Sequence, residues 1–514
     1  MVVKFTRKRP GVARAVIAGV SPADVAVEKS VDPVAEFQHK VEEVVQCFHD
    51  QSVTPKTFLE LENDLAGAAL AMCRQILERE ANRVEPKDKD QLPKRVRYRK
   101  EKYRLNQRTP AMIATRFGAI QVRSYYYLNE EAGEPGLHPV RLRLGLGAGS
   151  ATPALVERVA RMAVDHTQAE VRAWLKCEYG LTWSNTRLRA ALRGFRQALV
   201  PYVLELQTER LRALLEQAEN SRGRHRPVLA AGRDGVMIPM CCGDPQEACT
   251  ATVSVYDRQR RRLGTVSLGQ MPEPKQRTMT RTLTQLLQAT LLAYQGRLPR
   301  LAYLTDKGSA PDEYYRRTLK KMRHPRDDSP LTWEWVLDFY HVACYVGTLS
   351  ETLFGAKSKQ GAQWFAKMRR WLRDRRQGIA QVIRSAMQYL DRRKMTKVQK
   401  TAFWKAYRYL RRHRRYMDYE GYRRRGLPIG SGVTEAACKT VFTQRFKRSG
   451  MRWEAESGQV ILDLRVMHLS GIWQDAFAKD LAARDLPEPI ASPRQTPQRG
   501  SHQHSRETSA RIAA

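Results

Sequence analysis

The sequence predicts a mixed α/β protein in which helical segments precede and interrupt one larger sheet. Three observations predict this class. Residues 226–340 alternate between short apolar runs, rich in β-branched residues, and longer stretches with helical spacing. Two earlier segments, 36–82 and 152–215, repeat apolar residues at helical intervals. Residues 345–425 are helical again and stand before a last glycine-rich motif, so they are interpreted as a helical insertion in the sheet domain.

Charge is the strongest feature of the composition. The 514 residues include 90 Lys and Arg against 53 Asp and Glu, a net charge of +37. Such an excess predicts a polyanionic partner, because Lys and Arg release counterions when they contact phosphates. The sequence has no run of about 18 apolar residues, so no membrane partner is expected. Its first residues lack the apolar core of a secretion signal, so we expect a cytoplasmic protein. Ribosomal and chromatin proteins are equally basic, but they are usually much shorter.

The eight cysteines form no C-x-x-C pair, and no zinc-finger spacing occurs among them. Cys241, Cys242 and Cys249 could form a metal cluster together with His225. The simpler interpretation, which we prefer, is that the cysteines are small buried hydrophobic residues in a reducing interior.

The elements before residue 150 differ in character from one another. Residues 1–35 are basic and predict a flexible arm. Residues 36–110 predict a helical region, with apolar residues at Leu61, Leu65 and Ala68, followed from residue 83 by a charged linker. Residues 111–150 predict a small β-rich element because β-branched and aromatic residues crowd there.

Residues 151–220 predict a helical region that resembles a helix-turn-helix. Thr167 and Ser184 are expected N-caps, and Gly180 is expected to end the first helix. The second helix carries one apolar stripe, formed by Leu188, Leu192, Phe195 and Leu199. Three arginines lie outside this stripe and are candidates for DNA contacts: Arg187, Arg189 and Arg193. An ordinary helical hairpin would show the same pattern.

Residues 226–475 predict a domain built on a mixed sheet. The expected strands are 227–240, 251–256, 263–268, 300–305 and 333–337, and the expected helices between them are 279–294 and 310–323. After about residue 482 the chain is rich in Pro, Ser, Gln and Arg, so residues 485–514 predict a disordered tail.

Four acidic residues stand where apolar strands or glycine-rich turns end. Asp234, Asp306 and Asp338 each follow an apolar run, and Glu435 lies where Gly-Ser-Gly-Val-Thr enters a helix. Carboxylates at neighbouring strand ends can converge, and oxygen ligands of this kind bind Mg²⁺ together with substrate phosphate. Taken singly, each Asp also suits an ordinary turn, and Glu435 could pair with Lys439 at i, i+4.

The order of these motifs resembles that of transposases of bacterial insertion sequences, most closely the Kra-type subgroup. The motifs are Asp234-Gly, Thr305-Asp-Lys-Gly, Leu337-Asp-Phe-Tyr-His-Val, Gly430-Ser-Gly-Val-Thr-Glu-Ala-Ala-Cys-Lys and Lys447-Arg-Ser-Gly-Met-Arg-Trp. The resemblance covers about residues 115–470. It implies a ribonuclease-H-like catalytic core over 226–475, with metal-dependent strand cleavage and strand transfer on DNA.

The family's Asp-Asp-Glu triad carries over onto particular residues. The resemblance implies Asp234, Asp306 and Glu435 as catalytic residues and metal ligands, with Mg²⁺ or Mn²⁺ as two ions. Asp338 is the alternative second acid, because Lys307 departs from the Asp-Gly that relatives often show. With Asp306 as the second acid, Asp338-Phe-Tyr-His341 resembles a downstream motif in which the histidine assists near the site. Alternatively, His341 simply hydrogen-bonds a carbonyl at a helix start.

The remaining implications concern the partner. DNA contacts are expected from Lys439, Arg445, Lys447, Arg448 and Arg452, with double-stranded DNA of the element ends and of the target as the ligand. A homo-oligomer on DNA, associated with the bacterial nucleoid, is implied. Two alternatives stay open: a structure-specific nuclease on the same core, and an inactive DNA-binding regulator derived from a transposase.

Overall fold

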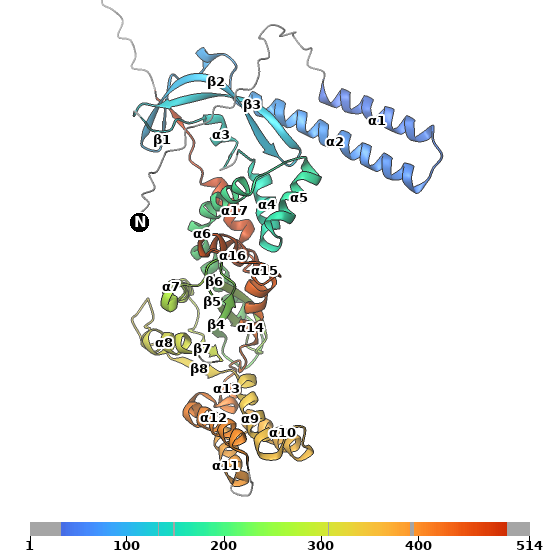
Figure 1. The fold of residues 1–514 in the computed structure, drawn as a ribbon. Coiled ribbons are helices and arrows are strands. Elements are labelled where there is room, and N and C mark those ends of the chain that lie inside the picture. Colours follow the sequence, from blue (N-terminus) through green and yellow to red (C-terminus); the bar gives the residue numbers. More distant parts are fainter. Residues whose placement is uncertain (1–31, 132, 148–149, 307, 391–394, 491–514) are drawn as a thin grey trace, which may run out of the picture. The chain divides into compact units, whose positions relative to one another are not determined.

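The computed structural model describes residues 32–490, except 132, 148–149, 307 and 391–394. The chain divides into two compact units, 1–80 and 81–514 (Figure 1). The helices of the chain include α3 (Pro139–Arg143), α8 (Ser309–Arg317), α10 (Lys359–Asp374), α11 (Gly378–Leu390) and α13 (Tyr419–Arg424). Among the described residues, no helix is both long and apolar enough to cross a membrane.

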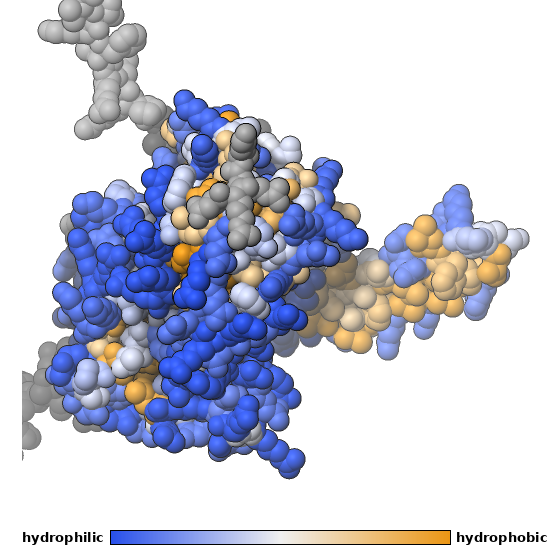
Figure 2. Space-filling view, turned by 90° about the horizontal axis from the view of Figure 1, so that it is seen from below, coloured by the Kyte–Doolittle hydropathy of each residue, from blue (hydrophilic) through white to orange (hydrophobic). Residues whose placement is uncertain are grey.

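The first unit is a helical hairpin of α1 (Pro33–His49) and α2 (Pro55–Arg83). An edge contact between Phe48 and Phe58 closes its tip, with ring centroids 6.3 Å apart. Much apolar surface stays exposed, including that of Phe58 and Leu59, and Figure 2 shows it as orange residues along the hairpin. Residues 32–80 carry ten Asp and Glu against four Lys and Arg, so the hairpin is acidic in a basic chain. The predicted arm overlaps the start of α1, and residues 1–31 lie outside the described part of the chain.

The smaller sheet has the strand order β3-β2-β1-β9, all antiparallel. Its strands are β1 (Arg95–Tyr98), β2 (Glu101–Thr115), β3 (Gly118–Asn129) and β9 (Glu488–Pro489). The predicted charged linker up to residue 110 is therefore wrong. Charged residues alternate there with buried ones such as Val96 and Tyr103, which is the pattern of a half-buried strand rather than of a solvated linker.

The predicted disordered tail is also wrong at its start. Pro489 pairs with Val96, and the backbone N–H of Ile490 donates to the carbonyl of Arg95 at 3.0 Å. The tail's composition shows no core-forming pattern, but strand pairing uses the backbone and needs no apolar side chain. Residues 491–514 lie beyond the described part of the chain.

The larger sheet has the order β6-β5-β4-β7-β8. Its strands are β4 (Val228–Ile238), β5 (Gln246–Tyr256), β6 (Arg262–Gln270), β7 (Arg300–Thr305) and β8 (Trp333–Leu337). β4, β5 and β6 run antiparallel, whereas β7 and β8 run parallel to β4. This confirms the predicted mixed sheet and all five of its strands within a few residues. Helix α7 (Arg277–Ala293) contributes Leu283 and Leu287 to the core beside the sheet.

A single 35-residue helix, α6 (Asn185–Glu219), joins two hydrophobic clusters. Leu192 and Phe195 in its first half pack in one cluster with α4 (Pro153–Asp165), α5 (Gln168–Tyr179), α16 (Ala455–Leu469) and α17 (Trp473–Ala482). Leu211 and Leu215 in its second half pack in the other cluster, with the larger sheet. The predicted boundary between 220 and 226 is therefore not a boundary between compact units.

The helical insertion begins with α9 (Phe339–Phe354), directly after β8 and six residues before the predicted start at 345. It continues through α12 (Lys397–His413) to Arg424. The chain then returns through α14 (Gly432–Ala437), a π-helical turn (Cys438–Thr443) and α15 (Gln444–Phe446). A Cβ at Gly430 would lie 3.0 Å from the Tyr340 ring, so the glycine-rich motif passes close over the start of α9.

The cysteines differ from the prediction that they are buried. Cys249 and Cys438 are buried, whereas Cys241 and Cys242 are exposed, as are Cys47, Cys177 and Cys344. The alternative metal cluster with His225 does not form among the described residues, where no group of three or more His, Cys, Asp or Glu is placed to hold an ion.

Candidate active site at the sheet edge

Three of the predicted acids gather at one edge of the larger sheet. Gly232 is the last residue of β4 that pairs with β7, and Asp234 lies two residues further on. Asp306 follows the last residue of β7, and Asp338 follows the last residue of β8. Because these three strands are parallel, their carboxyl ends share one edge, where ligands of open α/β sheets commonly bind.

The Asp306 carboxyl group is strongly affected by its surroundings. Its pKa is raised to about 6, chiefly by burial and also by repulsion from Asp234 and Asp338, while His341 acts in the opposite direction. Among the described residues, no hydrogen bond from another residue reaches its carboxylate oxygens. Negative charge is thus concentrated between Asp234 and Asp306, and a cation held there would relieve the repulsion.

The Asp338 side chain is fully buried and both of its oxygens are engaged. Oδ1 accepts the backbone N–H of His341 at 2.6 Å and so caps α9. Oδ2 accepts the backbone N–H of Ser431 and also its hydroxyl, the latter at 3.0 Å. These bonds join the start of the insertion to the glycine-rich motif, so Asp338 has a structural task that Asp306 lacks.

Glu435 is connected to the other acids through its own helix. The Ser431 hydroxyl lies 3.0 Å from Glu435 Oε1 as well as from Asp338 Oδ2. Three residues after Glu435, the Cys438 thiol donates to Asp234 Oδ2 at 3.2 Å. Burial and Asp234 raise the pKa of Cys438, so it stays a neutral donor. Sequence reasoning missed both Ser431 and Cys438, although both lie inside the motif that contains Glu435.

Close packing of α14 on the sheet positions Glu435. The hydroxyls of Thr434 and Thr252 are 2.8 Å apart and buried. A Cβ added at Gly232 would lie 2.0 Å from Thr434 Oγ1. The glycine two residues before Asp234 therefore lets α14 approach β4.

Aromatic side chains from the insertion support the loop that carries Asp306. The Tyr345 and Tyr409 rings stack with centroids 3.9 Å apart, and His341 meets Tyr345 edge-on at 5.4 Å. The Tyr409 hydroxyl donates to the backbone carbonyl of Asp306 at 3.4 Å. Tyr409 comes from α12, about a hundred residues after Asp306, so local sequence gave no signal for it.

The donor set suits a hard divalent cation, which prefers oxygen ligands. The described residues hold no preformed group of three metal-binding side chains. Two carboxylates, Asp234 and Asp306, are nevertheless coupled, and Mg²⁺ is commonly held by one or two carboxylates together with phosphate and water. These residues therefore fit a Mg²⁺ or Mn²⁺ ion bound jointly with a substrate phosphate.

The helix ends predicted for the helix-turn-helix-like segment are present in α5 and α6. Thr167 and Glu170 form a capping box, Ser184 caps α6, and Gly180 ends α5 at φ +62°. Arg189 and Arg193 are exposed, and Arg193 lies 3.4 Å from the exposed Glu456. Arg187 is half-buried and lies over the Trp183 ring.

One of the predicted DNA contacts is misplaced. Arg445 is 3 % exposed, it donates to the carbonyl of Ala163 at 3.2 Å, and burial lowers its pKa to about 10. Its side chain therefore fastens α15 to α4 and does not face solvent. The other basic residues of this segment are exposed: Lys439, Lys447, Arg448 and Arg452. Of these, Arg448 lies 3.3 Å from Glu170 at the start of α5.

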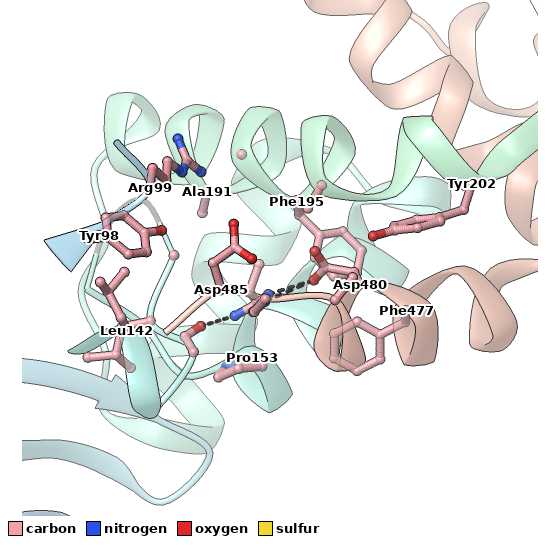
Figure 3. A pocket seen from close by; sticks show the side chains of 18 residues that line it. Tyr98, Arg99, Leu142, Pro153, Ala191, Phe195, Tyr202, Phe477, Asp480 and Asp485 are labelled. Atoms are coloured by element: carbon pink, nitrogen blue, oxygen red, sulfur yellow. Dashed lines mark hydrogen bonds and ion pairs between the residues drawn. The ribbon is translucent and has the colours of Figure 1, made fainter. Parts of the chain in front are cut away.

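A cavity of about 330 Å³ lies between β1, α6 and α17 (Figure 3). Tyr98, Phe195 and Phe477 line it, and Arg484 reaches the Asp480 carboxylate at 2.7 Å. None of the four candidate acids belongs to its lining. It is therefore a packing seam between the small sheet and the last helix, separate from the acidic edge.

No family model matches this chain, and no curated protein matches it significantly.

Proposed function

We propose that this protein is a DNA transposase with a ribonuclease-H-like catalytic core. The observation that carries the proposal is the pair of interacting carboxylates, Asp234 and Asp306, at the carboxyl edge of a five-stranded mixed sheet. Glu435 lies on α14, and Cys438, three residues further along the chain, bonds Asp234. The chain has a net charge of +37 but a small acidic centre. This combination suits the proposal, because carboxylates can hold cations while Lys and Arg hold DNA.

The proposed chemistry is phosphoryl transfer. Water would first cleave the strand at an element end, and the freed 3′-hydroxyl would then attack target DNA. Asp234, Asp306 and Glu435 would hold Mg²⁺ or Mn²⁺. When bound, the metal would neutralise charge at the reacting phosphate. The chain's own part is positioning. Gly235 and Cys438 orient the Asp234 carboxylate, and Ser431 orients Glu435.

Asp306 is the better supported second acid. Its carboxylate is free of hydrogen bonds from other described residues, whereas both oxygens of Asp338 are used to cap α9 and bind Ser431. We propose His341 as an auxiliary group, since it lowers the pKa of Asp306 and its ring stands against Tyr345. We also propose that α5 and α6 bind the element ends and that the protein works as a homo-oligomer on DNA.

The test is cleavage and joining of DNA by the full chain with Mg²⁺. The substrate is a plasmid carrying the gene with its native flanking DNA, and the products are nicked ends and strand-transfer joints. We expect Asp234→Asn and Glu435→Gln to lose both products, by about a thousandfold or more, while they keep duplex binding. Nicks without joints would indicate the structure-specific nuclease. Equal activity of these variants and the parent would exclude the triad, and binding without any reaction would indicate the regulator.

A further inference from the structure

Seven arginines line a cavity of about 400 Å³ at the opposite end of β4 from the acids. They come from the segment before β4, the β5–β6 turn, the start of β7 and the segment that leads into it, and the end of α13. We call this cavity the arginine pocket. Segments far apart in the sequence thus bring many positive charges to one place.

Few carboxylates balance this charge. Arg300 and Arg425 share Glu334, at 3.8 and 2.6 Å, and Arg425 also lies 3.8 Å from Asp418. Arg424 reaches only Glu420, at 3.9 Å. Glu219 is the single acid in the lining, and it already accepts the Tyr294 hydroxyl and the backbone N–H of Arg297.

Four arginines of the pocket have no ion-pair partner within 4.0 Å among the described residues: Arg224, Arg226, Arg258 and Arg297. The Nε atom of Arg226 is moreover buried and makes no hydrogen bond. A buried donor without an acceptor is costly unless a ligand supplies one. Arg224 and Arg297 are exposed, so an anion can approach from solvent.

The field inside the pocket is positive, as His225 shows. Burial lowers the pKa of His225, and Arg260, Arg224 and Arg300 lower it further. All three charged groups that act on this imidazole are arginines. Planar guanidinium groups suit phosphate oxygens especially well, because each can donate two parallel hydrogen bonds.

We propose that the arginine pocket binds the phosphodiester backbone of duplex DNA, as a contact separate from the acidic edge. Arg226 and Arg258 would clamp a phosphate at the base of the pocket, and Arg224 and Arg297 would hold it at the rim. Val228 and Asp234 are six residues apart on β4, so the two sites are about 20 Å apart along the strand. The pocket takes DNA as its partner from the proposed function, but it does not depend on any chemistry at the acids.

The experiment measures binding of the full chain to a 30-base-pair duplex by fluorescence anisotropy over a range of salt concentrations, without divalent metal. The test variant combines Arg224→Gln, Arg258→Gln and Arg297→Gln. We expect affinity to fall on the order of tenfold and the salt dependence to become less steep by about 2 to 3, since each phosphate contact contributes about 0.9. A matched control removes three exposed arginines elsewhere, Arg411, Arg412 and Arg414, and we expect it to lose less than about threefold.

Equal losses in the test and control variants would overturn the pocket, because they would indicate a uniform effect of net charge. The lysine version of the test variant keeps the charge but loses the paired guanidinium donors, so it should recover only part of the affinity. If the triple variant unfolds early in a thermal melt, Arg297→Gln alone, at an exposed position, should still weaken binding two- to threefold.

Calorimetry with orthophosphate distinguishes free phosphate from DNA as the ligand of the pocket. If the triple variant loses orthophosphate binding while its duplex affinity is unchanged, the DNA assignment is wrong. Because binding is measured without divalent metal and without cleavage, this test and the cleavage test fail independently.

Discussion

At the scale of residues, Asp306 and Asp338 show how surroundings separate two similar carboxyl groups. Each follows a parallel strand. Both carboxylate oxygens of Asp338 accept hydrogen bonds, whereas the Asp306 carboxylate is repelled by Asp234. The raised pKa of Asp306 means that its proton is bound more tightly in the folded chain than in the unfolded one. Its contribution to stability is therefore present below about pH 4 and is lost as the pH rises through about 6.

Because of this difference, we expect Asp→Asn to change the free energy of unfolding in opposite directions at positions 306 and 338. Without metal at pH 7, Asp306→Asn should raise the free energy of unfolding by about 1–2 kcal/mol, because it removes a penalised charge, and should abolish cleavage. Asp338→Asn should lower it by about 1–3 kcal/mol, because an amide cannot accept all three bonds. Chemical denaturation and the plasmid assay measure both. A stable but inactive Asp338→Asn beside an active Asp306→Asn would make Asp338 the second acid.

His138 gives a second residue-scale prediction, on pH. Burial and Arg141 lower its pKa to about 4, and its ring lies 3.1 Å from the Ser124 hydroxyl. The folded chain disfavours the protonated ring, so stability is present above about pH 6.5 and falls as the pH drops towards 4. We expect His138→Gln to remove about 1–3 kcal/mol of this acid-dependent loss, measured by denaturation at pH 7 and pH 4.5. An unchanged pH profile in the variant would contradict this.

At the scale of elements, the packing of α14 on β4 decides whether Glu435 lies near Asp234. The contact depends on a missing side chain at Gly232, where Thr434 fills the space. Helix α6 has a comparable role, because apolar residues of its first half pack in the cluster with α5 and those of its second half pack in the cluster with the larger sheet.

The prediction at this scale compares two glycines. Gly232→Ala should push α14 away, cost about 1–3 kcal/mol of stability and lower cleavage more than tenfold while duplex binding stays. Gly432→Ala is the matched control on the same helix, α14, since a Cβ there meets no atom within 4 Å. It should cost less than about 0.5 kcal/mol. Thermal melts and the plasmid assay report the result, and equal effects of the two changes would exclude the close approach as the cause.

At the scale of the whole molecule, charge is unevenly distributed between the two units. Residues 1–80 carry ten Lys and Arg against twelve Asp and Glu, so the whole excess of Lys and Arg lies in residues 81–514. We therefore expect a fragment of residues 81–514 to bind the 30-base-pair duplex within about threefold of the full chain, with a similarly steep salt dependence. Anisotropy titrations of both proteins measure this. A loss of tenfold or more would place essential DNA contacts in residues 1–80.

Sequence alone determined the elements whose patterns are local. The five strands of the larger sheet, the caps at Thr167 and Ser184, and the apolar stripe of α6 all follow from side-chain period and capping chemistry, and all are present. Sequence also identified Asp234, Asp306, Asp338 and Glu435, because acids after apolar runs are conspicuous.

Only the tertiary structure decided which groups these residues meet. The bonds that occupy Asp338, the thiol on Asp234 and the burial of Arg445 join segments from 93 to 282 residues apart. The β2 strand was mistaken for a linker because its charges are compatible with both until a partner strand is known. Charge could be counted from the sequence, but the arginine pocket could not be located there, because its walls come from four separate parts of the chain. Spatial convergence of this kind depends on how the sheet and helices pack, and no local pattern records it.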